Sequence, residues 1–329
     1  MEDIKKAFEQ RAKWYNNRAS AIFPVFISQT CDSYIVFQNY WKWKNAIKEC
    51  LFNIRIYNNK GSLIGLFSQK IVEEHYQISI KSILKSENAK KSSINNNVTN
   101  LSAEVEVISL ENLSFPFPAV MLFNHDYKSG EISCVHSGGR SINTNELKIK
   151  RRFQETNWLT LQNDDFTPFF HIFNPGIEEQ ITSGKVIVHI SEKPEIKIES
   201  LFNIPGEAFS SKVYYLEDLL TENELSIIKN ETFFLEVSFE SFGFMRLIVG
   251  NYYKIDHFHY ITHSFGKIDS KSKDLSTSNE NTISSFLPMP NVFPLDLKSK
   301  LYPTNSYSKL KLHKFNVLPN EKEKKSNTI

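Results

Sequence analysis

Apolar and polar residues alternate along much of the chain, and this alternation predicts β-strands. Residues 52–56 and 186–190 place an apolar side chain at every second position, which puts these side chains on one face of a sheet. The sequence Asn-Asn-Lys-Gly at 58–61 supplies a hairpin turn between two such runs. Many short strands with few helical stretches predict an all-β protein built from antiparallel β-sandwiches.

An internal repeat organises these strands. Two stretches, 117–139 and 244–266, each contain an apolar run that ends in Asn and, after eleven further residues, a His-Ser pair. We therefore expect two tandem β-sandwich-like domains that arose by internal duplication. The two asparagines follow apolar runs, so we expect them to form turns. The identical residues, each pair separated by 127 positions, are Phe117/Phe244, Asn124/Asn251, His136/His263, Ser137/Ser264 and Gly139/Gly266.

Helical spacing and composition set the remaining boundaries. Apolar residues at three- and four-residue spacing predict an amphipathic N-terminal helix, and a short helix over 216–228 that begins at Thr221 or at Glu217–Asp218. The Pro-spaced apolar run 286–295 predicts an extended segment in the C-terminal tail. The expected parts are the helix 1–20, repeat 1 at 21–143 with a flexible insert at 86–102, a linker at 144–154, repeat 2 at 155–267, and a partly disordered tail at 268–329.

Composition narrows the function classes. The 329 residues carry a formal net charge of +2, with a short basic cluster at 148–152, which does not favour nucleic-acid binding. Three cysteines without CxxC spacing indicate a reducing compartment. Met1 precedes charged residues rather than a signal peptide, and no apolar run reaches the roughly 18 residues of a membrane helix. The predicted location is the cytoplasm.

The repeated His-Ser pairs are the first candidates for chemistry. His136 and His263 each end an apolar strand, next to a serine and close to a glycine. They are candidate catalytic residues, but the same positions also suit a structural role in which His donates to a loop carbonyl and Ser caps a turn. An adjacent His and Ser on one strand point to opposite faces, which disfavours a Ser-His nucleophile.

A histidine-rich strand in the second repeat is a candidate metal site. If the strand is continuous, His257, His259 and His263 lie on one face. The set suits a divalent ion such as Zn or Fe, with Asp256 or His136 as a further ligand. Repeat 1 has no matching histidines at the positions equivalent to the first two.

Arginines and aromatic residues indicate a binding site. Arg140 follows the first His-Ser pair, and Arg246 interrupts an apolar run, where it needs an internal partner such as Glu236 or Glu240, or an anionic ligand. Aromatic faces with a few polar groups are typical of carbohydrate-like ligand sites. The candidate ligand-binding residues are Arg140, Arg246, Trp41, Trp43, Tyr252 and Tyr253.

Three functions remain open from the sequence. The first is a binding or accessory protein that holds a small polar molecule or glycan in a cleft between the repeats. The second is a His-dependent, metal-assisted enzyme, a hydrolase or sugar-modifying enzyme, centred on the second repeat. The third is a structural protein that forms homo-oligomers through residues 286–295. A sandwich fold does not choose between an enzyme and a binding protein.

Overall fold

The structure, a computed structural model, describes residues 18–86, 99–111, 118–136, 150–158, 160–176, 183–191, 193, 195–242 and 246–266. The chain divides into two compact units, Met1–Lys267 and Ile268–Ile329. All described residues lie in the first unit, so both predicted repeats belong to a single compact unit. The predicted C-terminal tail, with the oligomerisation segment 286–295, lies outside the described residues.

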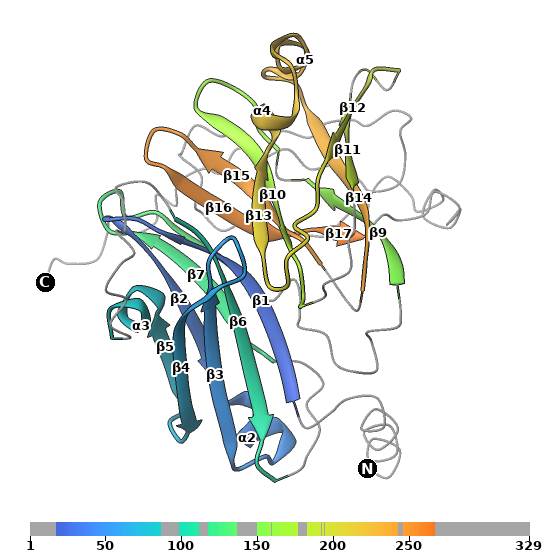
Figure 1. Ribbon diagram of the computed structural model, residues 1–329. Coiled ribbons are helices and arrows are strands. Elements are labelled where there is room, and N and C mark those ends of the chain that lie inside the picture. The colour runs from blue at the N-terminus through green and yellow to red at the C-terminus, as the bar shows by residue number, and fades with distance from the viewer. Residues whose placement is uncertain are drawn as a thin grey trace, which may run out of the picture. The chain divides into compact units, whose positions relative to one another are not determined.

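The first half of this unit consists of two antiparallel four-stranded sheets (Figure 1). Their strand orders are β1-β6-β3-β4 and β5-β2-β7-β8. The strands are β1 (Arg18–Ile27), β2 (Cys31–Gln38), β3 (Cys50–Tyr57), β4 (Leu63–Ile71), β5 (His75–Ser79), β6 (Thr99–Ser109), β7 (Met121–Asp126) and β8 (Ile132–His136).

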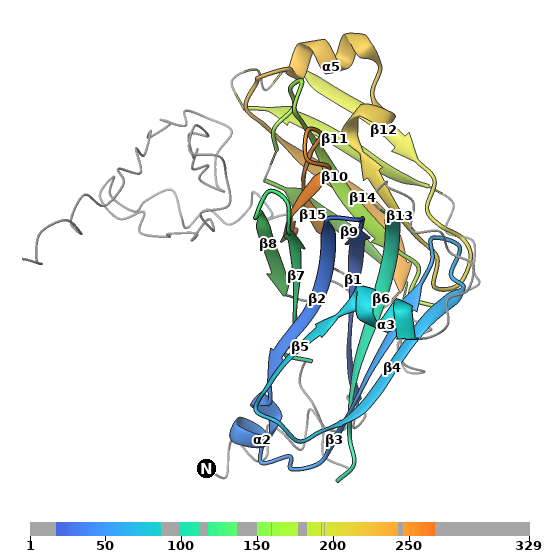
Figure 2. The ribbon, with the colours of Figure 1, turned by 90° about the vertical axis from the view of Figure 1, so that its left-hand side faces the viewer.

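The second half also consists of two antiparallel sheets (Figure 2). Their strand orders are β12-β11-β14-β9-β17 and β13-β10-β15-β16. The strands are β9 (Lys150–Asn157), β10 (Phe166–Phe173), β11 (Gly184–Ile190), β12 (Lys197–Phe202), β13 (Ser211–Tyr215), β14 (Phe233–Phe242), β15 (Ile248–Tyr253), β16 (Phe258–His263) and β17 (Phe265–Gly266).

The two halves have the same strand order. When β9 to β16 are matched in turn with β1 to β8, each sheet of the second half repeats a sheet of the first, and β17 is added at one edge. The hairpin registers agree as well, because Met121 pairs with His136 and Ile248 pairs with His263, each 127 positions later. His136 and His263 therefore hold equivalent positions in the two halves. Descent of both from one duplicated module stays a prediction.

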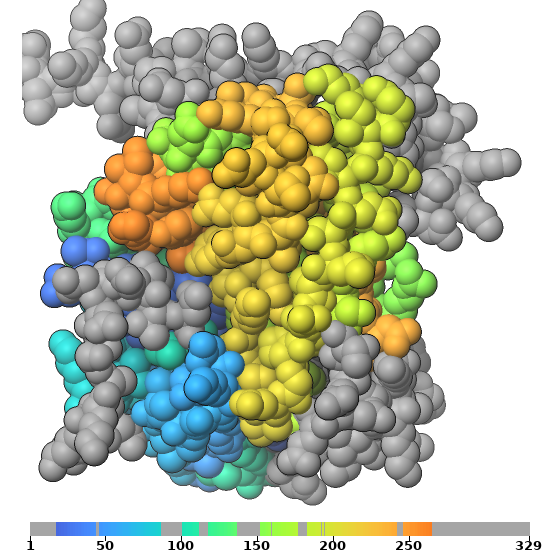
Figure 3. Space-filling model, turned by 45° about the horizontal axis from the view of Figure 1, so that its top comes forward, coloured from blue at the N-terminus to red at the C-terminus, as the bar shows by residue number. Residues whose placement is uncertain are grey.

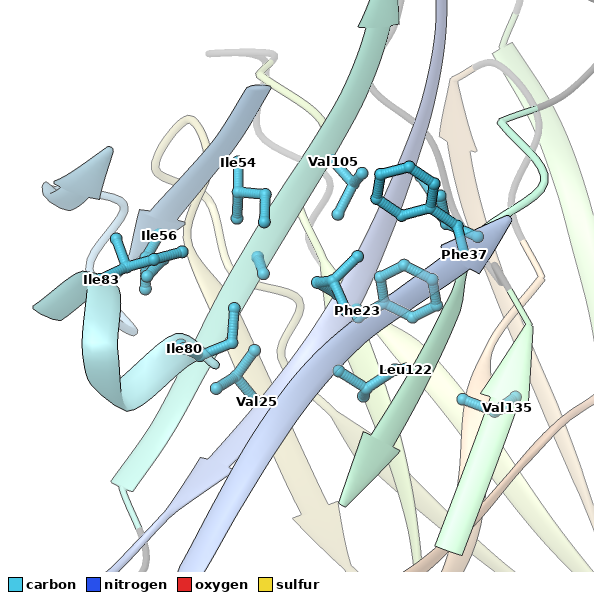
Figure 4. Packing of buried hydrophobic residues seen from close by; sticks show 14 of the residues in the cluster. Phe23, Val25, Phe37, Ile54, Ile56, Ile80, Ile83, Val105, Leu122 and Val135 are labelled. Carbon is cyan, nitrogen blue, oxygen red and sulfur yellow. The ribbon is translucent and has the colours of Figure 1, made fainter. Parts of the chain in front are cut away.

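Alternating side chains fill the space between the two sheets of the first half. Phe23, Ile54 and Val105 from one sheet pack against Leu122 and Val135 from the other (Figure 4). This core continues into the second half, because Phe169, Val213, Ile248 and Ile261 belong to the same buried cluster. The all-β architecture predicted from the alternation is confirmed, and its hydrophobic core crosses the boundary between the halves.

The helices are short and lie in connections between strands. They are α2 (Tyr40–Asn45), α3 (Ile80–Ser86), α4 (Leu216–Leu219) and α5 (Glu222–Ile228). The single helix predicted over 216–228 is wrong, since Leu220 adopts an extended conformation between α4 and α5. Thr221 begins α5 with a capping box that includes Glu224, which satisfies the first backbone N–H groups.

Three predicted segments have boundaries that differ from the structure. Residues 18–20 belong to β1 rather than to the N-terminal helix, whose remainder lies outside the described residues. Residues 99–102 belong to β6 and Ser86 ends α3, so the predicted insert 86–102 is wrong at both ends. Strand β9 begins at Lys150, inside the predicted linker 144–154. Ladder pairing with β14 overrides the polar composition of this segment.

The prediction of turns at Asn124 and Asn251 is also wrong. Both asparagines lie inside strands, β7 and β15, and both are fully buried. Each accepts a hydrogen bond through Oδ1, from the Ser33 hydroxyl at 2.7 Å and from the Leu161 N–H at 3.1 Å respectively. The two equivalent asparagines are therefore part of the packed interior rather than of turns.

Candidate functional site

The imidazole rings of His136 and His263 are in contact. Their ring centroids lie 4.4 Å apart and the ring planes are tilted by 54°. His136 ends β8 and His263 ends β16, and these strands lie side by side at the edges of their sheets. The two candidate catalytic histidines thus meet at one place, one from each half.

The residue after β16 orients His263. The Nδ1–H of His263 donates to the Ser264 carbonyl oxygen at 2.8 Å, so the lone pair of the neutral ring lies on Nε2. The Ser264 side chain is completely buried, and its hydroxyl donates to Oε2 of Glu155 at 2.6 Å. Glu155 lies on β9, where it pairs with Gly266 of β17. The crossing from β16 to β17 therefore brings the Glu155 carboxyl group to the residue next to His263.

Arg246 adds a positive charge beside these groups. It is half-buried, two residues before β15. The expected partners were Glu236 or Glu240, but Glu236 bonds Nε2 of His189 at 3.2 Å. Arg246 makes no ion pair with any residue that the structure describes. Its charge acts instead on His263 and Glu155.

The surroundings shift the pKa values of the two half-buried titratable groups, His263 and Glu155. Burial lowers the pKa of His263, the hydrogen bond to Ser264 opposes this, and His136 and Arg246 lower it further. Burial raises the pKa of Glu155, while the Ser264 hydroxyl and Arg246 act in the opposite direction. His263 is therefore neutral at pH 7. We call His136, His263, Arg246, Glu155 and Ser264 the candidate site.

Direct contacts join the halves around the candidate site. The Ser133 hydroxyl on β8 donates to the His259 carbonyl at 3.1 Å and accepts from the Ile261 N–H at 2.9 Å, both on β16. Side-chain bridging of this kind joins two sheet edges without a continuous backbone ladder. Tyr57 stacks on Phe209 farther along the interface, with ring centroids 4.9 Å apart. Figure 3 shows the β3–β4 turn against the second half there.

The predicted cleft between the repeats is occupied by packed side chains at these points. The Ser102 hydroxyl donates to Ser211 Oγ at 2.7 Å and lies 3.3 Å from Nε2 of His171. All three residues are buried, and burial lowers the pKa of His171 to about 3. His171 is therefore neutral, and it packs in the interface between the two halves.

The structure does not gather the predicted metal ligands. His257 is exposed in the turn before β16 at a φ of 55°, where Tyr252 Oη lies 2.6 Å from its Nδ1. His259 is buried, with Nε2 at 2.8 Å from Tyr215 Oη. His263 lies four residues farther, about 13 Å along the strand. Within the described residues, no group of three or more His, Cys, Asp or Glu side chains is arranged to hold a metal ion.

The predicted ligand-binding residues lie in separate places. Trp41 of α2 is completely buried in the core of the first half, and Trp43 is 54% exposed and contacts His75. Tyr252 contacts His259, whereas Tyr253 stacks on Phe166. Arg140 lies outside the described residues. Among the described members of this set, only Arg246 belongs to the candidate site.

Sequence reasoning missed several residues that form the interface and the candidate site. Glu155 was assigned to the beginning of repeat 2 without a role, and Phe26, Ser133 and His171 were not singled out. A carboxylate or serine at an alternating strand position carries little signal by itself, because it is most often solvated. Phe26 lies in an apolar run in which the neighbouring residues are also buried, so the sequence does not distinguish it from them. Their importance follows from contacts between distant strands.

None of the helices in the described part of the chain is long and apolar enough to cross a membrane. Comparison with protein-family models and with curated proteins gives no match.

Proposed function

We propose that the protein is a binding protein that takes a small polar ligand beside the interface between its halves, at His136, His263 and Arg246. The contact between the two imidazoles, with centroids 4.4 Å apart, carries this proposal. It joins equivalent strand ends from the two halves, and His136 is an exposed residue. A few fixed polar groups of this kind are the usual means of orienting a small ligand.

The spacing of the rings favours binding over two-histidine catalysis. A general acid and a general base that act on opposite sides of a reacting group must each lie about 3 Å from a different atom of that group. Rings that touch leave no room for a group between them. A ligand instead meets both imidazoles from one side, with Arg246 beside them.

A carbohydrate remains one member of the proposed ligand class. The aromatic platform that suggested a glycan is not assembled, because Trp41 is buried while Trp43 is exposed on the same helix, α2. The candidate site offers imidazole and guanidinium groups rather than a flat aromatic face. We therefore propose polar recognition, and carbohydrates serve as one arm of its test.

Thermal-shift measurements of the full chain with citrate, inorganic phosphate, sulfate, glucose and N-acetylglucosamine test the proposal. At least one of these compounds should raise the midpoint temperature of unfolding of the wild type. The same compound should not raise it for His136→Ala or Arg246→Gln. His75→Ala and Arg152→Gln are matched controls, because both side chains are exposed and lie outside the candidate site. The proposal would be refuted if no compound changed the midpoint temperature, or if the shift were equal in all variants.

A His-dependent hydrolase is the second candidate, and one observation favours it. The hydrogen bond from His263 Nδ1 to Ser264 fixes the tautomer that leaves Nε2 as a base. Hydrolysis of p-nitrophenyl acetate and p-nitrophenyl phosphate by the wild type, lost in His263→Gln and retained in His75→Ala, would support this function. Equal rates in the wild type and His263→Gln would exclude these two reactions at His263.

A further inference from the structure

We infer that the ligand at the candidate site is a small oxyanion, a carboxylate, phosphate or sulfate group, and that its binding is coupled to proton uptake by His136 and His263. This inference rests on the proposed function, because it concerns the same site. It specifies that the ligand is an anion and that its affinity depends on pH. Binding of a polar ligand does not by itself require either property.

Arg246 and Glu155 carry opposite charges in the candidate site. Arg246 contributes one positive charge and Glu155 one negative charge when ionised, and the two groups act on each other. His263 is neutral at pH 7, since burial lowers its pKa and the charge of Arg246 lowers it further. While both rings are neutral and Glu155 is ionised, these charges cancel and the site holds an anion weakly. Protonation of the two rings adds two positive charges.

The close contact of the rings makes their protonation depend on a ligand. Two imidazolium rings with centroids 4.4 Å apart repel each other, so in the empty site the second proton is held less tightly than the first. An oxyanion that accepts hydrogen bonds from both rings removes this repulsion. Proton uptake and anion binding therefore strengthen each other by the same factor.

Among the residues that the structure describes, groups from four segments contribute to the electrostatics around the pair. Strand β8 contributes His136 and, two residues earlier, Cys134, whose thiol stays neutral because burial raises its pKa. Strand β16 contributes His263, and β9 contributes Glu155. The segment before β15 contributes Arg246. The residues paired with the histidines, Met121 and Ile248, are uncharged.

The arrangement fits the geometry that oxyanions prefer. A guanidinium group and imidazolium N–H groups form short charge-assisted hydrogen bonds to carboxylate, phosphate and sulfate oxygens. One oxygen of the Glu155 carboxylate, Oε2, already accepts from the buried Ser264 hydroxyl. The ligand is therefore held by both protonated imidazole rings and by Arg246.

Isothermal titration calorimetry of the full chain with sulfate, phosphate and citrate, between about pH 5 and pH 8, tests the inference. Sulfate remains a dianion over this range, so the pH dependence of its affinity reports on the protein alone. We expect the sulfate affinity to rise about tenfold or more as the pH falls, with proton uptake visible as a dependence of the measured heat on the buffer. Phosphate and citrate then show which oxyanion the site prefers.

Variants separate the inference from the proposed function. Arg246→Gln should lose sulfate binding at every pH, and His136→Asn should bind sulfate with a much weaker pH dependence. His75→Asn, an exposed histidine outside the site, should behave like the wild type. Sulfate binding whose affinity does not change with pH, or binding of glucose without binding of any anion, would overturn the inference and leave the proposed function in place. Failure of every ligand would overturn both.

Discussion

Phe26 and His259 form a parallel stack across the interface between the two halves, with ring centroids 3.7 Å apart and ring planes within 8° of each other. Phe26 lies near the end of β1, and His259 lies near the beginning of β16. Phe169 meets both rings edge-on. Because both members of the stack are buried, the interface is part of the hydrophobic core, and its integrity depends on a neutral imidazole.

Substitution of His259 should separate the contribution of its ring from that of its nitrogen atoms. His259→Ala removes the stack and leaves a cavity, so we expect a loss of about 3 kcal/mol or more in the free energy of unfolding. His259→Phe keeps the stack and removes Nδ1, a buried atom without a hydrogen-bond partner among the described residues, at the expense of the Tyr215 contact. We expect a loss of about 1 kcal/mol or less for this variant. Urea unfolding measures both values, and equal losses would contradict a role of the stack.

Acid should destabilise the fold through two buried histidines. Burial lowers the pKa of His171 to about 3 and that of His259 well below its usual value. As the pH falls below about 6.5, both histidines become protonated in the unfolded chain but stay neutral in the folded chain. The free energy of unfolding is therefore highest above this pH, and below it decreases by about 1.4 kcal/mol per pH unit for each histidine.

Urea unfolding of the wild type and of His171→Gln, each at several pH values, measures this loss. The variant should lose stability with pH less steeply than the wild type, by the contribution of one histidine. His75→Gln changes an exposed ring and should keep the full slope. Identical slopes in the wild type and His171→Gln would show that His171 does not carry the effect.

Gly250 should tolerate no side chain. A Cβ atom at this position would lie 1.8 Å from the Tyr260 carbonyl oxygen on the adjacent strand, and two paired backbones cannot separate without breaking the β15–β16 ladder. We expect Gly250→Ala to lower the free energy of unfolding by about 3 kcal/mol. At Gly206 the same atom would meet nothing within 4 Å, so Gly206→Ala should change stability by less than about 1 kcal/mol. Thermal or urea unfolding of the two variants compares them directly.

The capping box of α5 should contribute measurably to stability. Thr221 Oγ1 accepts from the Glu224 N–H at 3.4 Å, and the Thr221 N–H donates to the Glu224 side chain at 2.8 Å. Thr221→Ala should therefore cost about 1 kcal/mol in urea unfolding. Ser226→Ala changes an exposed hydroxyl later in the same helix and should have little effect. A similar loss in both variants would show that the effect does not come from the cap.

Much of the fold could be predicted from the sequence because strands and hairpins are local patterns. The alternation at 52–56 predicted β3, and the turn residues 58–61 predicted its pairing with β4. Segments with a weak pattern were missed. Strand β9 has the composition of a linker, yet it is paired along its length with β14. Helix α3 follows β5 directly, in a stretch whose apolar spacing also fits a strand.

The candidate site could be predicted only in part. The repeat identified His136 and His263 as equivalent, and the structure places both at the ends of matching strands. Nothing in the sequence indicated that their rings touch. The metal prediction assumed one continuous strand through His257, but the chain turns at that residue, with a φ of 55°.

The sequence by itself determined which residues face the interior of each sheet and which positions correspond between the halves, because both properties depend on spacing along one chain. Tertiary structure alone decided that the edge strands β8 and β16 meet, that Phe26 covers His259, and that Arg246 acts on Glu155 and His263. These contacts join residues more than eighty positions apart, except for the contact between Arg246 and His263. They depend on how the four sheets pack around two hydrophobic clusters, one of which spans both halves. Close packing selects one such arrangement from many that the same local patterns allow.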